Sequence, residues 1–221
     1  MCGRYTITKN IELIKEFFNI KDSDLSYHEN FNACPSQELP IITNSAKDKI
    51  SFYKWGLIPF WSKDPSIGNK LTNARAETIL EKPSSKESLR KRRCLVITDG
   101  YYEWKTENKE KQPYRIKMKD DSLFVMAGIF DHWKDGNNNI IKTFSIITTE
   151  ANELLNEIHH RMPVIFNKKE LFDKWLDESL KEDDILAMLR TLDSEYFEPY
   201  PVSKKVNSPI NNYAEIIEKV G

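Results

Sequence analysis

The segment between residues 94 and 149 most constrains the fold, because strand-like stretches follow one another there without an intervening helix. Runs of β-branched, aromatic and other apolar residues predict strands at 94–98, 101–104, 114–118, 123–130 and 143–149. Asp99-Gly100 and Asp135-Gly136-Asn137-Asn138 are turn signals inside this segment. Because the segment lacks βαβ alternation, it favours an antiparallel α+β fold.

Helical patterns flank this segment. Residues 8–20 place apolar side chains at helical spacing behind a capping residue, Thr8 or Asn10. The same patterning predicts helices at 151–158, 169–176 and 184–192, and strands at 39–43, 50–58 and 164–166. The chain has no repeat, low-complexity linker or break in composition. We therefore expect a single domain over residues 1–221.

The charge balance limits the partners that the chain can recognise. Lys and Arg number 33 and Asp and Glu 34, which leaves a net charge of −1 and no overall basic field to attract nucleic acid. Any site for a polyanion must be local, and the basic run at 90–93 is interpreted as a solvated sheet edge. No signal-peptide pattern and no apolar run of about 20 residues is present. We expect a soluble cytoplasmic protein that does not bind membranes.

The cysteines argue against a disulfide framework. Cys2, Cys34 and Cys94 form neither a CxxC pair nor an even set. Together with four histidines they show no metal-ligand spacing. We expect reduced thiols, no structural metal and no cofactor.

Cys2 stands directly after Met1, and this position gives it a chemistry that no internal cysteine has. Removal of Met1, which a small second residue allows, would leave an amine and a thiol on adjacent carbons. With an aldehyde, such an aminothiol forms a Schiff base and then closes to a thiazolidine, and proximity favours the second step. Reference pKa values of about 8 for the amine and about 8.5 for the thiol leave both poised near neutral pH. The alternative is that position 2 merely tolerates a cysteine.

Three other polar residues have both a catalytic and a structural interpretation. Glu103 lies between two aromatic residues, where apolar surroundings would favour a neutral carboxyl that acts as a general acid; alternatively, strand alternation turns it to solvent. His159 could shuttle protons or be a structural histidine, and His160 is expected to point elsewhere. Asn73 either forms a turn or orients a substrate hydroxyl or carbonyl.

Basic and aromatic side chains accompany these positions. Arg4, Arg75 and Arg161 lie beside the candidates in sequence, and arginine offers a forked donor suited to phosphate. Trp55 and Trp61 flank a turn that contains proline, where exposed rings could stack on bases. Core packing is the preferred interpretation for Trp55.

Short motifs occur in order along nearly the whole chain. They are Met-Cys-Gly-Arg-Tyr at 1–5, Trp-Gly-Leu-Ile-Pro at 55–59, Asn-Ala-Arg-Ala-Glu-Thr at 73–78, Arg-Arg-Cys-Leu at 92–95, Asp-Gly-Tyr-Tyr-Glu-Trp at 99–104, Met-Ala-Gly-Ile-Phe at 126–130, Ile-Thr-Thr at 147–149, Ile-His-His-Arg-Met-Pro at 158–163 and Pro-Val-Ser at 201–203. Each motif alone is weak, but the ordered set is specific. On this set the sequence resembles the SRAP family, the SOS-response-associated peptidase-like proteins that crosslink to abasic sites in single-stranded DNA.

The resemblance implies a mostly antiparallel, curved or barrel-like β core with flanking helices. It implies that Cys2, exposed when the protein's own processing activity removes Met1, attacks the ring-opened sugar aldehyde. The product would be a stable thiazolidine that shields the lesion. Glu103 would act as acid and base, Asn73 would position the amine or the sugar, and His159 would assist proton transfer, also in reversal or strand-cleaving elimination.

The resemblance also implies how DNA is held. Arginines would bind phosphates around the lesion, and a tryptophan would stack where duplex meets single strand. The protein would act as a monomer and associate with the nucleoid when bound to DNA. The implied DNA-binding set is Arg4, Arg75, Arg161, Trp61, Asn32 and Thr149.

Two other classes of function stay open at this point. An N-terminal-nucleophile amidohydrolase would use Cys2 against an amide, and it predicts an oxyanion hole and a four-layer αββα build that this helix count does not readily supply. A non-catalytic nucleic-acid-binding module would bind DNA unchanged after Cys2→Ala. Cys34 stands before Pro35, where a small apolar residue is expected, and we predict that this second thiol is inert.

Overall fold

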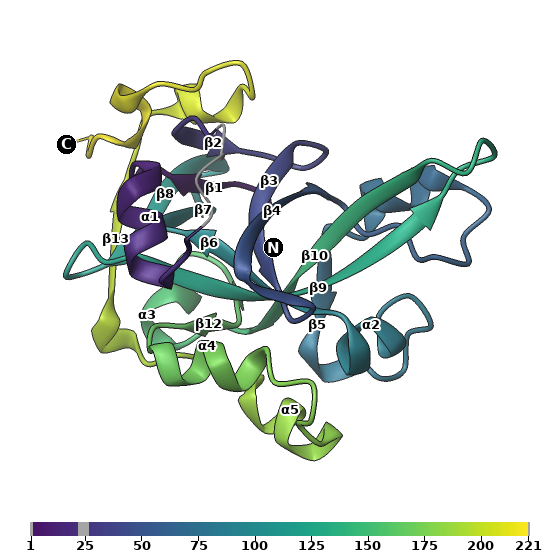
Figure 1. Cartoon of the computed structure of the whole chain (residues 1–221). Coiled ribbons are helices and arrows are strands. Elements are labelled where there is room, and N and C mark those ends of the chain that lie inside the picture. The colour runs from purple at the N-terminus through teal and green to yellow at the C-terminus, as the bar shows by residue number, and fades with distance from the viewer. Residues whose placement is uncertain (1, 22–26, 221) are drawn as a thin grey trace.

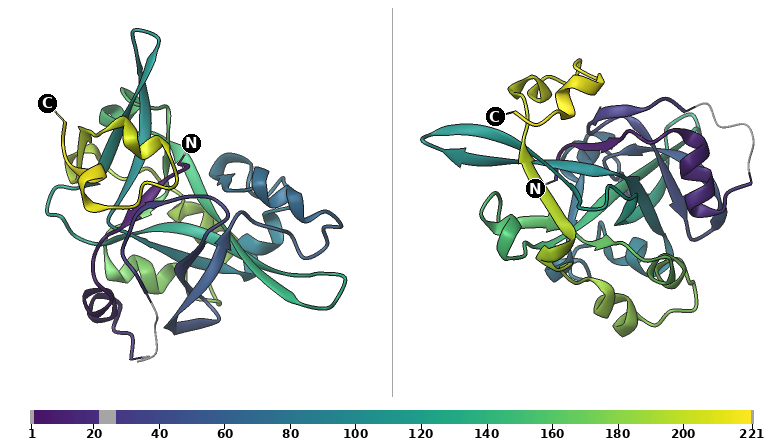
Figure 2. Two further views of the ribbon diagram at one scale, coloured as in Figure 1. Left: turned by 90° about the horizontal axis from the view of Figure 1, so that it is seen from above. Right: turned by 90° about the vertical axis from the view of Figure 1, so that its left-hand side faces the viewer.

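Two β-sheets form the frame of the molecule, which the computed structural model describes in residues 2–21 and 27–220. The first sheet has the spatial order β13, β8, β7, β1, β2, and its pairings are antiparallel. The hairpin formed by β7 and β8 projects from the body of the molecule (Figure 2). The bounds of these strands are β1 Tyr5–Ile7, β2 Asn30–Ala33, β7 Gly100–Glu107, β8 Glu110–Met118 and β13 Phe197–Pro201.

The second sheet closes on itself. Its spatial order is β11, β10, β4, β3, β6, β9, β12, and β5 adds to β10. The bounds are β3 Glu38–Thr43, β4 Ala46–Trp55, β5 Asn73–Arg75, β6 Arg93–Thr98, β9 Phe124–Lys134, β10 Ile140–Glu150, β11 Arg161–Pro163 and β12 Ile165–Phe166. Because β10 pairs with both β4 and β9, strands β4, β3, β6, β9 and β10 form a closed ring without a free edge, which we call the barrel. The long β9–β10 hairpin extends outward from this ring (Figure 1).

Short helices cover the ends and one side of the barrel (Figure 1). Helix α1 begins at the side chain of Asn10, which accepts from the Leu13 N–H at 2.9 Å, and it ends at Asn19, which adopts a left-handed φ of 55°. Within the described residues, no helix is long and apolar enough to cross a membrane. The helices are α1 Ile11–Phe18, α2 Lys86–Lys91, α3 Glu153–Asn156, α4 Lys169–Trp175 and α5 Glu182–Met188, with 3₁₀ turns at Pro65–Lys70, Ala76–Thr78, Ser194–Tyr196, Lys204–Asn207 and Ala214–Ile217.

Aromatic packing joins the two sheets. The ring of Trp55, at the end of β4, lies 5.2 Å from that of Tyr5 in an edge-to-face arrangement and 6.3 Å from that of Phe144 in a stacked one. The Trp55 indole is fully buried and donates to the carbonyl of Thr72 at 2.8 Å. Each such aromatic pair contributes about 0.5–1.5 kcal/mol beyond the area it buries. The core interpretation of Trp55 is confirmed, and these contacts hold β1 against the barrel.

The predicted α+β class and barrel-like core are confirmed. The strands predicted at 94–98, 114–118 and 143–149 lie within β6, β8 and β10. Strands β1, β2, β5, β11 and β13 and helix α2 were not predicted, because each is too short to show a clear hydrophobic period.

The basic run at 90–93 is not a sheet edge, and only part of it is solvated: Arg90 and Lys91 are exposed at the end of helix α2, whereas Arg93 is buried. Arg93 begins β6 with a fully buried side chain. Its guanidinium donates to the carbonyls of Trp175 at 2.8 Å and Asp177 at 2.6 Å, and to two carbonyls of α2. A buried guanidinium is tolerated only with such acceptors, which come from a distant part of the chain.

Candidate active site

Strand pairing brings the first residues of the chain to the side of β7. In the β1–β7 pair, the Tyr102 N–H donates to the carbonyl of Arg4 at 2.9 Å. Continued by one residue, this register sets Gly3 opposite Glu103, and the neighbouring Cys2 lies close enough to Glu103 for its charge to act on the thiol. The thiol is fully buried, and burial first and Glu103 second raise its pKa far above the ordinary value. Cys2 is therefore a protonated thiol at neutral pH in this state.

Asn73 holds the main chain of Cys2. Strand β5 runs parallel to β10 and sets Asn73 opposite Ile146. From there Asn73 Nδ2 donates to the Cys2 carbonyl at 2.9 Å. The other end of the amide, Oδ1, is buried without a hydrogen-bond partner among the described atoms. A buried unsatisfied acceptor is costly, and here it would accept from a donor that enters the site.

Glu103 is buried, and the solvent-facing interpretation of this residue is therefore wrong. Its side chain is 3% exposed, in the aromatic part of β7. Burial raises the pKa of Glu103 from 4.5 to about 7. Both protonation states are therefore populated at neutral pH, which suits a group that must give and take protons in one reaction.

His159 is held with a defined ring orientation. The Arg161 N–H donates to His159 Nδ1 at 3.0 Å, and the same ring nitrogen lies 3.3 Å from the Arg161 carbonyl. Burial is the first cause of a lowered His159 pKa, and His160 adds to the effect. The two histidine rings stack with centroids 4.5 Å apart, so the expectation that His160 points elsewhere was wrong. The pair lies between α3 and β11, outside regular structure, where neighbouring side chains can share a side.

An open pocket of about 400 Å³ lies on the solvent side of Glu103 and His159. Glu103 and His159 line it together with Trp104, Lys111 and Asn207. The Trp104 indole N–H donates to Asn207 Oδ1 at 2.8 Å, which sets the plane of the ring. Lys111 and Asn207 were not predicted, because neither belongs to a pattern that is visible in the sequence.

The C-terminal segment supplies one wall of this pocket and lies beside the β7–β8 hairpin (Figure 2). Arg4, predicted to bind phosphate, donates to Asn32 Oδ1 at 2.7 Å and to the carbonyls of Val206 at 2.9 Å and Asn207 at 3.1 Å. Asn32 is fully buried, and its amide donates to carbonyls of the same segment, including that of Asn211 at 2.8 Å. In this structure both side chains fasten the C-terminal segment to the start of the chain.

Of the four other predicted DNA-binding residues, two are buried and two are exposed. Arg161 is nearly buried and forms a two-point ion pair with Glu77 at 2.8 and 3.0 Å. Thr149 is buried on β10. Arg75 is exposed two residues after Asn73, and Trp61 is 49% exposed on the loop after β4. Of these four side chains, only those of Arg75 and Trp61 are therefore accessible to a ligand from solvent.

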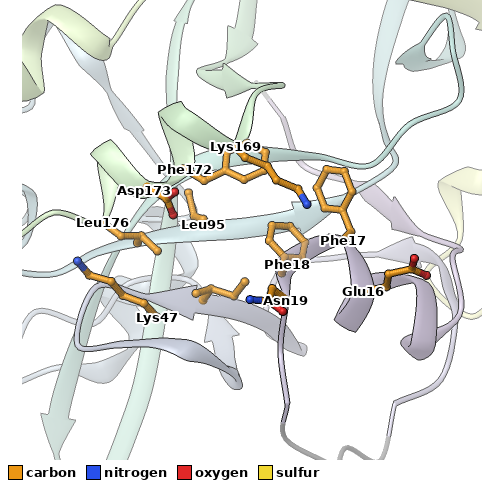
Figure 3. A pocket seen from close by; sticks show the side chains of 11 residues that line it. Glu16, Phe17, Phe18, Asn19, Lys47, Leu95, Lys169, Phe172, Asp173 and Leu176 are labelled. Carbon is orange, nitrogen blue, oxygen red and sulfur yellow. The ribbon is translucent and has the colours of Figure 1, made fainter.

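A separate pocket of about 510 Å³ lies between α1 and α4 (Figure 3). Phenylalanine side chains from both helices line it, with Lys47 and Lys169 at its rim. No predicted site residue lines this pocket. Within the described residues no group of three or more metal-ligating side chains is present.

Comparison with known proteins identifies the family. The family described as SOS response associated peptidase (SRAP) matches residues 1–209. The chain belongs to the SRAP family. The SRAP chain is 43% identical to the Bacillus subtilis protein named abasic site processing protein YoqW, over 99% of each chain.

More distant relatives extend the likeness. The SRAP chain is 32% identical to the Xenopus tropicalis protein named abasic site processing protein HMCES, with 90% of this chain and 68% of that protein covered. A crystal structure of a protein from Bacteroides thetaiotaomicron matches with a TM-score of 0.90 and 35% identity, covering 99% of this chain and all of that chain.

Proposed function

We propose that this SRAP protein processes abasic sites in single-stranded DNA by forming a covalent bond through Cys2. The observation that carries the proposal is the placement of Cys2 against Glu103, with its carbonyl held by Asn73 and an open pocket beside it. The names of the relatives support an abasic site as the lesion.

The reaction needs a free amine on Cys2, and so requires removal of Met1, which lies outside the described residues. Protonated Glu103 donates to the ring oxygen of the abasic sugar and releases the C1′ aldehyde. The amine of Cys2 attacks C1′, and loss of water gives a Schiff base. The thiol sulfur then adds to the same carbon, and the thiol proton ends on the nitrogen. The sum is one aldehyde plus one aminothiol giving one thiazolidine and one water.

The buried groups fit the order of these steps. In the chain that still carries Met1, burial raises the pKa of the Cys2 thiol. A thiol that stays protonated is a weak nucleophile toward the aldehyde, and it reacts once the Schiff base holds it close. His159, whose pKa burial lowers and whose ring is held by Arg161, can move protons at the lesion, including in a reversal or strand-cleaving elimination. We propose the same site for the self-processing that exposes the amine. The protein would act as a monomer in the cytoplasm, at the nucleoid when bound to DNA.

The test is intact-mass spectrometry under denaturing conditions after mixing protein with a single-stranded oligonucleotide that carries one abasic site. Wild type should lose Met1 and gain the mass of the oligonucleotide less one water. Cys2→Ala should form no such stable adduct. Cys2→Ser should form one only with borohydride, because its amine still makes the Schiff base but no thiol closes the ring. A wild-type protein that has lost Met1 and still forms no adduct would refute the crosslinking function and favour amide hydrolysis.

A further inference from the structure

Two buried tyrosine hydroxyls near Cys2 take no part in the hydrogen bonding of the fold. Tyr5 of β1 and Tyr101 of β7 are fully buried, and they lie directly opposite each other in the β1–β7 pair. Among the described atoms, neither hydroxyl oxygen has a hydrogen-bond partner. A buried hydroxyl without a partner destabilises the folded state, so two of them on neighbouring strands point to a role outside the fold.

Both hydroxyls are close to the Cys2 sulfur. Residues directly opposite each other in an antiparallel pair put their side chains on the same face of the sheet, with Cβ atoms about 4.5–5.5 Å apart. Tyr5, Tyr101 and Cys2 all belong to the same buried cluster. Burial is the first cause that raises the pKa of each phenol well above its ordinary value, and the Cys2 sulfur is the second cause in both. Glu103, two residues after Tyr101 on the same face of β7, also acts on Tyr101.

The Cys2 thiol has a different partner while it is protonated. It donates to the carbonyl of Arg4 at 3.8 Å. Once the proton leaves, this hydrogen bond is lost, because neither the sulfur nor the carbonyl then has a hydrogen to donate. A negative sulfur needs donors, and the O–H groups of Tyr5 and Tyr101 have no other acceptor among the described atoms. The buried surroundings exclude bulk water as a substitute.

We propose that the hydroxyls of Tyr5 and Tyr101 donate hydrogen bonds to the Cys2 sulfur while it closes the thiazolidine ring. This inference rests on the proposed function. In the ring-closing step the S–H bond breaks, the sulfur bonds to C1′ of the Schiff base, and the proton ends on the nitrogen. The sulfur carries negative charge between these events, and two donors fixed in a dry site stabilise that charge, as an oxyanion hole stabilises a negative oxygen.

Removing one hydroxyl at a time tests the inference, because phenylalanine keeps the shape of the ring. Each protein is released from an N-terminal fusion by a protease that cuts directly before Cys2, so its amine is free whatever the variant does to self-processing. It is mixed with a single-stranded oligonucleotide that carries one abasic site, and samples are quenched rapidly with or without borohydride. Samples without borohydride report the thiazolidine, and the excess with borohydride reports the Schiff base. Tyr5→Phe and Tyr101→Phe should form the Schiff base at the wild-type rate and convert it about tenfold more slowly, because each loses a hydrogen bond to a charged sulfur.

Tyr53→Phe is the matched control. Tyr53 is buried on β4, and its hydroxyl has a partner, His132 Nε2, at 2.8 Å. This variant should convert the Schiff base at the wild-type rate, and its Tm should be lower by about 2–4 °C because it loses a hydrogen bond. Tyr5→Phe and Tyr101→Phe lose no such bond, so each should melt at or above the wild-type Tm.

Three results would overturn the inference. They are a wild-type conversion rate in Tyr5→Phe and Tyr101→Phe, an equal slowing in Tyr53→Phe, and a lower Tm in Tyr5→Phe and Tyr101→Phe, which would give their hydroxyls a structural role. A wild-type protein that forms no Schiff base at all refutes the proposed function instead, so the two failures are distinguishable.

Discussion

Replacing Glu103 by Gln should stabilise the protein at neutral and alkaline pH while it slows the reaction. The Glu103 side chain is 3% exposed, and burial raises its pKa from 4.5 to about 7. Below pH 4.5 the carboxyl is protonated in both the folded and the unfolded chain, and stability is fully kept. As the pH rises from 4.5 toward 7 the unfolded chain loses its proton first, and the folded state loses up to about 3 kcal/mol. Glutamine keeps the shape of the protonated form and does not ionise, so it avoids this loss.

Urea unfolding between about pH 4.5 and pH 8 measures the effect. The difference in the free energy of unfolding between Glu103→Gln and wild type should rise with pH and level off above about pH 7. Glu150→Gln, at the exposed end of β10, is the matched control for the loss of a carboxylate that is not buried. A difference for Glu103→Gln that is flat over this range would refute the argument that burial raises the carboxyl pKa.

The same variant should react slowly with abasic DNA. Glutamine cannot donate a proton to the sugar ring or accept one later, and general acid–base groups of this kind contribute about 10²–10⁴-fold. The rate of adduct formation should therefore decrease by a factor in that range in Glu103→Gln, although the folded state of this variant is more stable. A variant that is less stable and equally fast would place Glu103 in a structural role.

Two further substitutions test the packing around the site. Gly100→Ala would place a Cβ 2.8 Å from Nε of the buried Arg115, and urea unfolding should show a loss of about 1–3 kcal/mol in stability. Gly136→Ala is the control: its Cβ would meet no atom within 4 Å, so its stability should stay within about 0.5 kcal/mol of wild type. Equal losses in the two variants would contradict the clash with Arg115. Arg161→Met removes the ion pair with Glu77 and should cost about 1–2 kcal/mol at about pH 7, a value discounted because the Glu77 side chain is 42% exposed. Because Arg161 lowers the pKa of Glu77 from 4.5, the cost should shrink as the pH falls below that value, and a constant cost would exclude the ion pair as its source.

The sequence predicts the long elements of this fold and misses the short ones. Strands β6, β8, β9 and β10 carry enough apolar residues to be predicted, and three of them, β6, β9 and β10, belong to the closed ring of the second sheet. Strands β1 and β5 have three residues each, and only their partners β7 and β10 define them as strands. The short strands nevertheless carry or adjoin Cys2 and Asn73, so the least predictable elements hold the site.

The environments of the site side chains were harder to predict than the positions of the long strands in the sequence. The aromatic neighbours of Glu103 suggest a raised pKa, but the sequence alone does not tell whether its side chain points to solvent or into the protein. In the folded chain the side chain is buried, and burial raises its pKa. Arg4 and Asn32 were predicted to bind DNA, but both bond to Val206, which lies 202 and 174 positions later in the chain, and no local sequence pattern indicates such a contact. Whether they also contact DNA stays a prediction.

The hydrogen bonds from Arg4 to the carbonyls of Val206 and Asn207 mean that the pocket is complete only after the last part of the chain has been synthesised. Arg4 and Val206 are 202 residues apart, an interval of about 10–40 s at about 5–20 residues per second. Throughout that interval the nascent chain carries Cys2 without the wall that Asn207 provides. A chain arrested before Lys204 therefore presents the thiol and the strands around it, but not the pocket that would select a damaged sugar over any other aldehyde in the cell.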